Sequence, residues 1–188
     1  MKQLIFLVFL TIPVLFCKAQ TNNLPPLDKS PMDMSYYPNN YPVLKIQDKA
    51  TEPVLARVIY SRPQKNGRII FGDLVEYGKV WRLGANEATE IEFYENVKID
   101  GKKVAKGRYT LYAIPSADNW TIILNKDVDT WGAFKYDAQK DVLRTTVPVQ
   151  ILNEVVEALA MNFEKADNGC NLIIAWDNVK TILPISIK

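Results

Sequence analysis

The chain has 188 residues, 48% of them hydrophobic, which is enough for one sizeable core and predicts a single domain. Its net charge is +2 and its longest run of basic residues is Lys102-Lys103, so we expect no nucleic-acid partner. Because the sequence contains no histidine, Ser-His and Cys-His nucleophile pairs, imidazole bases and histidine-bound metals are excluded, and we expect no metal and no cofactor.

Residues 1–19 predict a secretory signal peptide that is cleaved after Ala19. Lys2 precedes an apolar run from Leu4 to Phe16, and the small residue Ala19 stands where a signal peptidase cuts. A membrane anchor needs about 20 apolar residues, more than this run supplies, and the bulky residue before Cys17 disfavours acylation of that cysteine. We therefore expect export to the periplasm or the extracellular space, with no membrane span after cleavage.

Residues 20–31 are rich in proline and asparagine and predict a flexible tether, which leaves residues 32–188 as the expected domain. Met32 to Pro42 contains two methionines and three tyrosines, a composition that suits an extended segment packed along the domain. The β-branched residues of Val54 to Tyr60 predict a strand. We expect that strand to end at Pro63, because proline lacks the N–H donor of a strand ladder.

The middle of the chain alternates apolar and polar residues in short stretches. Thr89 to Phe93 predicts a strand whose two glutamates face solvent. Asp100-Gly101 predicts a hairpin turn, because both residues tolerate positive φ. Tyr109 to Ala113 alternates again, and Trp120 to Leu124 contains the additional apolar residue Ile123, which predicts a central strand covered on both faces.

The C-terminal part predicts further strands. Cys170 to Trp176 and Val179 to Ile187 both alternate, and Asp177-Asn178 between them predicts a two-residue hairpin turn. The segment Asn153–Ala166 fits both a helix and a strand: its composition favours a helix, whereas the surrounding hairpins favour a strand, which is our prediction. Once the signal is removed, Cys170 is the single thiol, so we expect no internal disulfide and a buried side chain.

These elements together define the expected fold class. About eight short strands separated by turns, with at most one short helix and no alternation of strands and helices, predict an all-β protein. The arrangement that fits best is an antiparallel β-sandwich of the jelly-roll-like kind.

Five sequence motifs occur in a characteristic order along the chain: YSRPQKNGRIIFG, WRLGANEAT, GRYTLYAIP, WTIILN and WGAFKYD. In these motifs the chain resembles a bacterial family catalogued as domain of unknown function 2911, from about Met32 to the C-terminus. The resemblance implies an exported, mostly β protein of a Gram-negative bacterium. It implies no particular activity.

The motif-rich loops suggest a binding site. Arginine pairs with carboxylates and phosphates through two parallel hydrogen bonds and also stacks on aromatic rings. We therefore expect a small anionic or carbohydrate ligand to bind at Arg62, Trp81, Arg82, Asn86, Glu87 and Trp131. The alternative is architectural: Arg62 and Arg82 pair with Glu87 or Asp73, and the nearby glycines form the turns that connect two sheets.

Two other functional classes remain open. A hydrolase of the glycosidase type needs two carboxylates, which Glu87 with Asp73 or Asp137 would supply, although their spacing selects no pair. We favour a protein without enzymatic activity, with Glu87 as the catalytic candidate otherwise. The third class is a structural or partner-binding envelope protein that uses the Met32 to Pro42 segment as its contact.

Two local patterns deserve separate interpretation. The motif DVDTWG begins like a calcium loop, but Trp131 and Ala138 occupy two ligand positions, which excludes an EF-hand and leaves an irregular site at Asp127 and Asp129 conceivable. Trp131, Tyr136 and Tyr112 would suit a sugar-stacking platform. Trp120 and Trp176 alternate with aliphatic residues and are predicted to lie in the core.

Overall fold

A computed structural model describes residues 24–187; the predicted signal peptide and the first residues of the predicted tether lie outside this range. The fold is all-β and antiparallel, as predicted, with nine strands where about eight were expected. The strands are β1 (Met32–Tyr37), β2 (Ala56–Ser61), β3 (Glu90–Phe93), β4 (Val97–Ile99), β5 (Lys102–Val104), β6 (Gly107–Pro115), β7 (Asn119–Asn125), β8 (Asp141–Ala166) and β9 (Gly169–Ser186). The described residues also include one short α-helix, α1 (Tyr41–Ile46), and a 3₁₀ turn at Ala138–Lys140.

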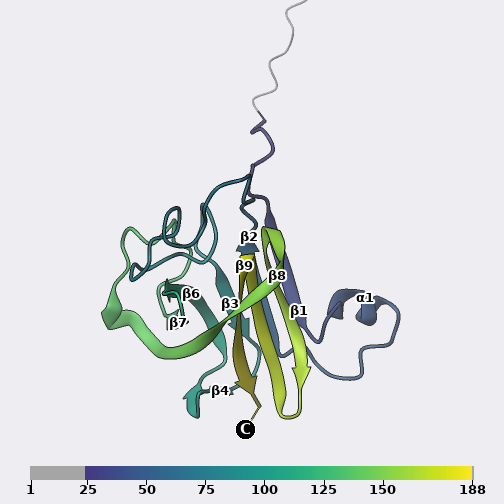
Figure 1. Cartoon of the computed structure of the whole chain (residues 1–188). Coiled ribbons are helices and arrows are strands. Elements are labelled where there is room, and N and C mark those ends of the chain that lie inside the picture. Colours follow the sequence, from purple (N-terminus) through teal and green to yellow (C-terminus); the bar gives the residue numbers. More distant parts are fainter. Residues whose placement is uncertain (1–23, 188) are drawn as a thin grey trace, which may run out of the picture.

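The nine strands form one sheet in the order β1-β2-β3-β6-β7-β8-β9-β4-β5. Figure 1 shows the long, bent ribbon of β8 that runs through it. The 26-residue strand β8 connects its two halves, because residues 141–148 pair with β7 and residues 149–166 pair with β9. The sheet thereby folds over on itself into two facing layers. Rings from the two layers meet between them: Tyr37 lies 6.4 Å from Phe163, and Trp81 lies 5.9 Å from Trp176.

The predicted hairpin at Asp100-Gly101 is confirmed. The two residues connect β4 to β5 with φ values of 51° and 70°, the positive φ at both central positions that a tight hairpin turn requires. The predicted segment Met32 to Pro42 is extended in its first half, where β1 adds to the sheet beside β2. Asn153–Ala166 lies within β8, so the prediction of a strand is also confirmed.

The predicted turn at Asp177-Asn178 is wrong, because both residues lie inside β9. Asp177 has a φ of 55° and faces Val156 across a register shift, so the pair forms an irregularity within the ladder. An aspartate with positive φ suits a β-bulge as well as a turn. The extra residues of this irregularity lie in β8, where residues 152–155 stand opposite the single Asn178 of β9, and the buried residues of β9 change from even to odd positions across it. The actual turn between β8 and β9 is at Asp167-Asn168.

The core between the layers is centred on aromatic rings. Trp120 and Trp176 are each 1% exposed, which confirms their predicted burial, and they pack with Phe71 and Trp81 at centroid distances of 5.1–6.3 Å. Ile123 is fully buried on the opposite face of β7, where it packs with Tyr112 beneath two loops. The prediction that this strand is covered on both faces is therefore confirmed.

The loops that cover the outer face of β6 and β7 are residues 74–89 and 126–137. They contribute Val80, Ala88, Ala133 and Tyr136 to the cluster around Ile123. These are the loops that carry most of the predicted ligand-binding residues. Among residues 24–187, no helix combines the length and the hydropathy needed to cross a membrane.

Candidate functional site

The loop from Trp81 to Thr89 is fixed to the sheet by polar contacts. The backbone of Trp81 exchanges hydrogen bonds with Ala113 on β6 at 2.7 and 3.0 Å. The hydroxyl of Ser61, at the end of β2, accepts from the Ala85 amide at 2.6 Å and donates to the Ala85 carbonyl. A side chain at Gly84 would place its Cβ 2.8 Å from the Ser61 hydroxyl, so this close approach requires glycine.

A second loop is held against the first by backbone hydrogen bonds. The Ala88 amide donates to the Thr130 carbonyl at 3.0 Å, and the Gly132 amide donates to the Asn86 carbonyl at 3.0 Å. Glu87 and Trp131 form an isolated antiparallel bridge between these contacts. Three of the six predicted site residues, Asn86, Glu87 and Trp131, are thus brought together by main-chain pairing.

Leu83 adopts a strained backbone conformation inside this loop. Its φ is 58°, a region that a bulky residue rarely occupies, and its side chain is completely buried. Such a conformation costs about 1–3 kcal/mol and persists only where the surroundings enforce it, often beside binding sites. Leu83 directly follows Arg82, the predicted ligand-binding residue whose Nε is buried without a hydrogen-bond partner in the described range.

Arg82 contributes to a hollow of about 250 Å³ between the two loops. The hollow is lined by Leu74, Val75, Glu76, Lys79, Val80, Trp81, Arg82, Ala133 and Phe134. The Nε of Arg82 is buried and has no hydrogen-bond partner within residues 24–187, and no carboxylate in this range forms an ion pair with the guanidinium. Burial lowers the pKa of Arg82 below its ordinary value, although a guanidinium stays charged at physiological pH.

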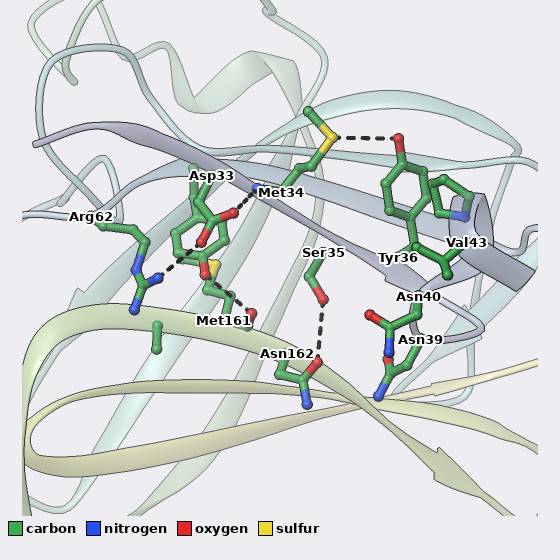
Figure 2. A pocket seen from close by; sticks show the side chains of 13 residues that line it. Asp33, Met34, Ser35, Tyr36, Asn39, Asn40, Val43, Arg62, Met161 and Asn162 are labelled. Carbon is green, nitrogen blue, oxygen red and sulfur yellow. Dashed lines mark hydrogen bonds and ion pairs between the residues drawn. The ribbon is translucent and has the colours of Figure 1, made fainter. Parts of the chain in front are cut away.

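Arg62 lies elsewhere. Its guanidinium forms an ion pair with Asp33 on β1 at 3.0 Å and donates from Nε to the Leu159 carbonyl on β8 at 3.1 Å. It lines a separate groove between those strands (Figure 2). The partner of Arg62 is therefore Asp33, and neither arginine pairs with Glu87 or Asp73 as the architectural alternative supposed.

The other predicted residues differ in exposure. The Trp81 ring is 8% exposed and belongs mainly to the core, with its Nε1 donating to the Gly84 carbonyl at 3.2 Å. The Asn86 amide donates to Asp28 at 3.0 Å. Trp131 is 62% exposed, as predicted for a surface tryptophan. Only Trp81 and Arg82 of the six line the 250 Å³ hollow, because the loop turns Asn86 and its neighbours away from it.

Glu87 lies at a different, smaller hollow of about 160 Å³, together with Glu90 and Asp129. The carboxylates of Glu90 and Asp129 both contact Arg108, and the Asp129 amide donates to Glu90 at 2.6 Å. Glu87 itself is exposed to solvent, whereas the general acid of a glycosidase occupies a desolvated pocket. Neither Asp73 nor Asp137, the suggested catalytic partners, lines this hollow.

The two aspartates of the DVDTWG motif are engaged in ion pairs. Asp127 contacts Lys140 at 3.0 Å, and Asp129 contacts Arg108. No group of three or more Cys, Asp or Glu side chains in the described part of the chain is arranged to hold a metal ion.

The aromatic platform suggested by the sequence is not assembled. Tyr112 is 2% exposed and packs edge-on against Tyr136 with centroids 5.2 Å apart, so its ring face is unavailable. Tyr136 donates to Asp141 at 2.6 Å, and the same carboxylate accepts from Arg144 at 2.7 Å. Burial and the hydrogen bond to Asp141 raise the pKa of Tyr136 to about 12.

The sequence interpretation missed two charged residues of the Arg82 hollow, Glu76 and Lys79, and its exposed aromatic residue, Phe134. Lys79 and Glu76 stand only a few positions before Arg82, so their proximity was visible in the sequence. Phe134 comes from a distant loop and is 84% exposed, which is unusual for phenylalanine. Only the backbone contacts between the two loops bring Phe134 to Arg82.

Comparisons with known proteins identify the family. The model of a protein family described as "Protein of unknown function (DUF2911)" matches residues 44–185, which include both loops and eight of the nine strands. No curated protein and no solved structure matches the chain. Because the match covers most of the sequence, including all five motifs, the chain belongs to the DUF2911 family.

Proposed function

We propose that this protein binds a small organic anion in the hollow at Arg82. The observation that carries the proposal is the guanidinium, which is half-buried, has a buried Nε without a hydrogen-bond partner in the described range and has no carboxylate partner there. A buried, unpaired donor is destabilising by about 1–3 kcal/mol. Unlike Arg57, whose guanidinium pairs with Glu92, Arg82 therefore has its hydrogen-bonding positions free for a ligand within the described part of the chain.

The lining of the hollow indicates the chemical class of the ligand. Arg82 and Lys79 outnumber the single carboxylate of Glu76, so the charge favours an anion. The walls include Val75, Trp81 and the exposed ring of Phe134, which suit an apolar body next to the charged group. A carboxylate or a phosphate monoester on an aromatic or aliphatic group fits both features better than an inorganic ion.

Binding is tested with benzoate, hexanoate and phenyl phosphate, by isothermal titration calorimetry and by thermal unfolding. At least one of these anions is expected to bind and to raise the Tm, whereas benzamide, the uncharged counterpart of benzoate, is not. Arg82→Met keeps the length of the side chain and removes its charge. Because a charge-assisted hydrogen bond contributes about 1.5–3 kcal/mol, this variant should bind about 10- to 150-fold more weakly.

The matched control is Arg57→Met, since Arg57 lies on β2 and is paired with Glu92 at 2.6 Å. This variant should bind the anions as the unchanged protein does. Failure of all three anions to bind at millimolar concentration, or equal binding by Arg82→Met, contradicts the proposal. If the predicted signal peptide directs export, the ligand is one present outside the cytoplasm.

A further inference from the structure

A groove with a volume of about 650 Å³ lies beside Arg62. It lies between β1, the turn that enters α1 and the second half of β8 (Figure 2). Its lining residues are Asp33, Met34, Ser35, Tyr36, Asn39, Asn40, Pro42, Val43, Tyr60, Arg62, Ala160, Met161 and Asn162. The volume is within the range of about 300–1,000 Å³ that small-molecule sites occupy.

The groove exists because the folded sheet does not close. β1 is an edge strand that pairs with β2. The second half of β8 pairs with β9 and, at one isolated bridge between Ala158 and Gln64, with the segment that follows β2; beyond that bridge the edges of β1 and β8 face each other across the gap. Three alternate carbonyl oxygens of β8 point away from β9 and accept hydrogen bonds from side chains: Leu159 from Arg62 (3.1 Å), Met161 from Tyr60 (3.2 Å) and Phe163 from Asn39 (2.7 Å).

These side-chain contacts argue against an extended peptide as the occupant. A peptide that added a strand to β8 would need the carbonyl oxygens that Arg62, Tyr60 and Asn39 already occupy. On the opposite rim, the Met34 amide already donates to the Asp33 carboxylate at 2.8 Å. The edge carbonyls of β8 along the groove are therefore already used, and this side of the groove offers side chains in place of backbone groups.

The charge of the groove favours a neutral ligand. Its lining contains one carboxylate, Asp33, and one guanidinium, Arg62, and these two pair with each other at 3.0 Å. No other charged side chain lines the hollow. In this respect the groove differs from the Arg82 hollow, where cations predominate.

The uncharged polar groups of the groove suit hydroxyl groups. Figure 2 shows the side chains of Asn39 and Asn40 at one end of it and that of Asn162 between them and Arg62, and Ser35 donates to the Asn162 oxygen at 3.4 Å. Each primary amide carries a donor and an acceptor side by side, and a sugar hydroxyl also donates and accepts, so adjacent hydroxyls fit an amide in pairs. The ring of Tyr36, whose hydroxyl contacts Met34, adds apolar surface for the C–H face of a sugar ring.

We propose that this groove is a binding site for a neutral saccharide, held by the Asn39, Asn40 and Asn162 amides and by Tyr36. The site is separate from the anion site at Arg82 and does not depend on it. The Asp33–Arg62 pair closes the opposite end of the groove and can itself accept and donate hydrogen bonds to hydroxyls.

The test is titration of the full folded chain with maltotriose, cellotriose and chitotriose. Binding is measured by calorimetry and by NMR of the amide side chains. We expect at least one of these trisaccharides to bind, and Asn162→Ala to weaken its binding about tenfold, the effect of about one lost hydrogen bond. Asn162 is exposed, so the variant should unfold at the same temperature as the unchanged protein. Asn153→Ala, at an exposed asparagine of the same strand outside the groove, is the matched control and should bind normally.

Three outcomes overturn the proposal: no trisaccharide binds at millimolar concentration, Asn162→Ala binds as tightly as the control, or an alternating Val-Thr heptapeptide perturbs the Asn162 amide while the sugars do not. The anion site is checked separately in the same samples. Arg82→Met should bind trisaccharide normally and benzoate should not compete with it, so failure of one site can be distinguished from failure of the other.

Discussion

Replacing Arg82 with methionine should make the unliganded protein more stable. The guanidinium is half-buried, and its Nε has neither solvent nor a partner among residues 24–187. Methionine retains most of the aliphatic packing of the side chain and has no donor to desolvate. The substitution therefore removes an unfavourable burial without breaking an ion pair that the structure contains.

The expected gain in the free energy of unfolding is about 1 kcal/mol. A fully buried, unsatisfied donor costs about 1–3 kcal/mol, and the lower end applies because the rest of the guanidinium reaches the hollow. For a chain of this length, about 1 kcal/mol corresponds to a rise in Tm of about 2–4 °C. Urea denaturation followed by tryptophan fluorescence measures the change directly, since Trp81, Trp120 and Trp176 all pack in the core.

Arg57→Met is a matched comparison. The Nε of Arg57 is likewise buried without a partner, but this arginine also pairs with Glu92 at 2.6 Å. Arg82→Met should exceed Arg57→Met in stability by the contribution of that pair, about 0.5–1 kcal/mol. If the free energy of unfolding of Arg82→Met is instead lower than that of the unchanged protein by about 1 kcal/mol or more, Arg82 stabilises the fold. The claim that its burial is unfavourable would then be wrong.

Three further predictions concern the body of the fold. Gly169→Ala would place a Cβ 2.2 Å from a backbone oxygen and should be destabilising by about 3 kcal/mol or more. At Gly101 an added Cβ meets no atom within 4 Å, so Gly101→Ala should cost only about 1 kcal/mol, because of its positive φ. Equal effects of the two substitutions in urea denaturation would contradict this. Cys170 is completely buried, and burial raises its pKa to about 12, so a water-soluble disulfide reagent should modify it only after unfolding. Rapid reaction of the native protein would contradict the burial of Cys170 in β9. The raised pKa of Tyr136 favours its neutral form in the folded state, so its contribution to stability is complete below pH 10.0 and is lost as the pH rises towards 12. Tyr136→Phe should reduce this alkaline loss of stability, and an unchanged dependence of the free energy of unfolding on pH would count against the contact with Asp141.

The turns show where local sequence signals suffice and where they do not. Asp100-Gly101 was predicted correctly because Ile99 and Lys102, on either side of it, pair with each other, so the local turn signal and the strand pairing agree. Asp177-Asn178 carries a similar local signal, yet β9 continues through it. An aspartate with positive φ serves a bulge and a turn equally well, and only the long partner strand β8 decides between them.

The candidate site shows the same division. The sequence directed attention to the loops around Arg82, because arginine, tryptophan and glycine are concentrated there. It did not separate Arg62 from Arg82, although the structure places them at different hollows. It also gave no sign of the groove amides, since Asn39 and Asn162 are 123 positions apart and come together only when the sheet folds over at β8.

The sequence by itself determined the strand-forming segments, the buried tryptophans Trp120 and Trp176 and the family, because side-chain alternation, turn chemistry and motif order are properties of neighbouring residues. Only the tertiary structure decided which charges are neutralised. Arg62 finds Asp33 because β1 adds beside β2, and Arg82 is left without a carboxylate in the described chain because its loop is held against a distant one. Such partners depend on strand order and on loop contacts between remote segments, which no local pattern encodes.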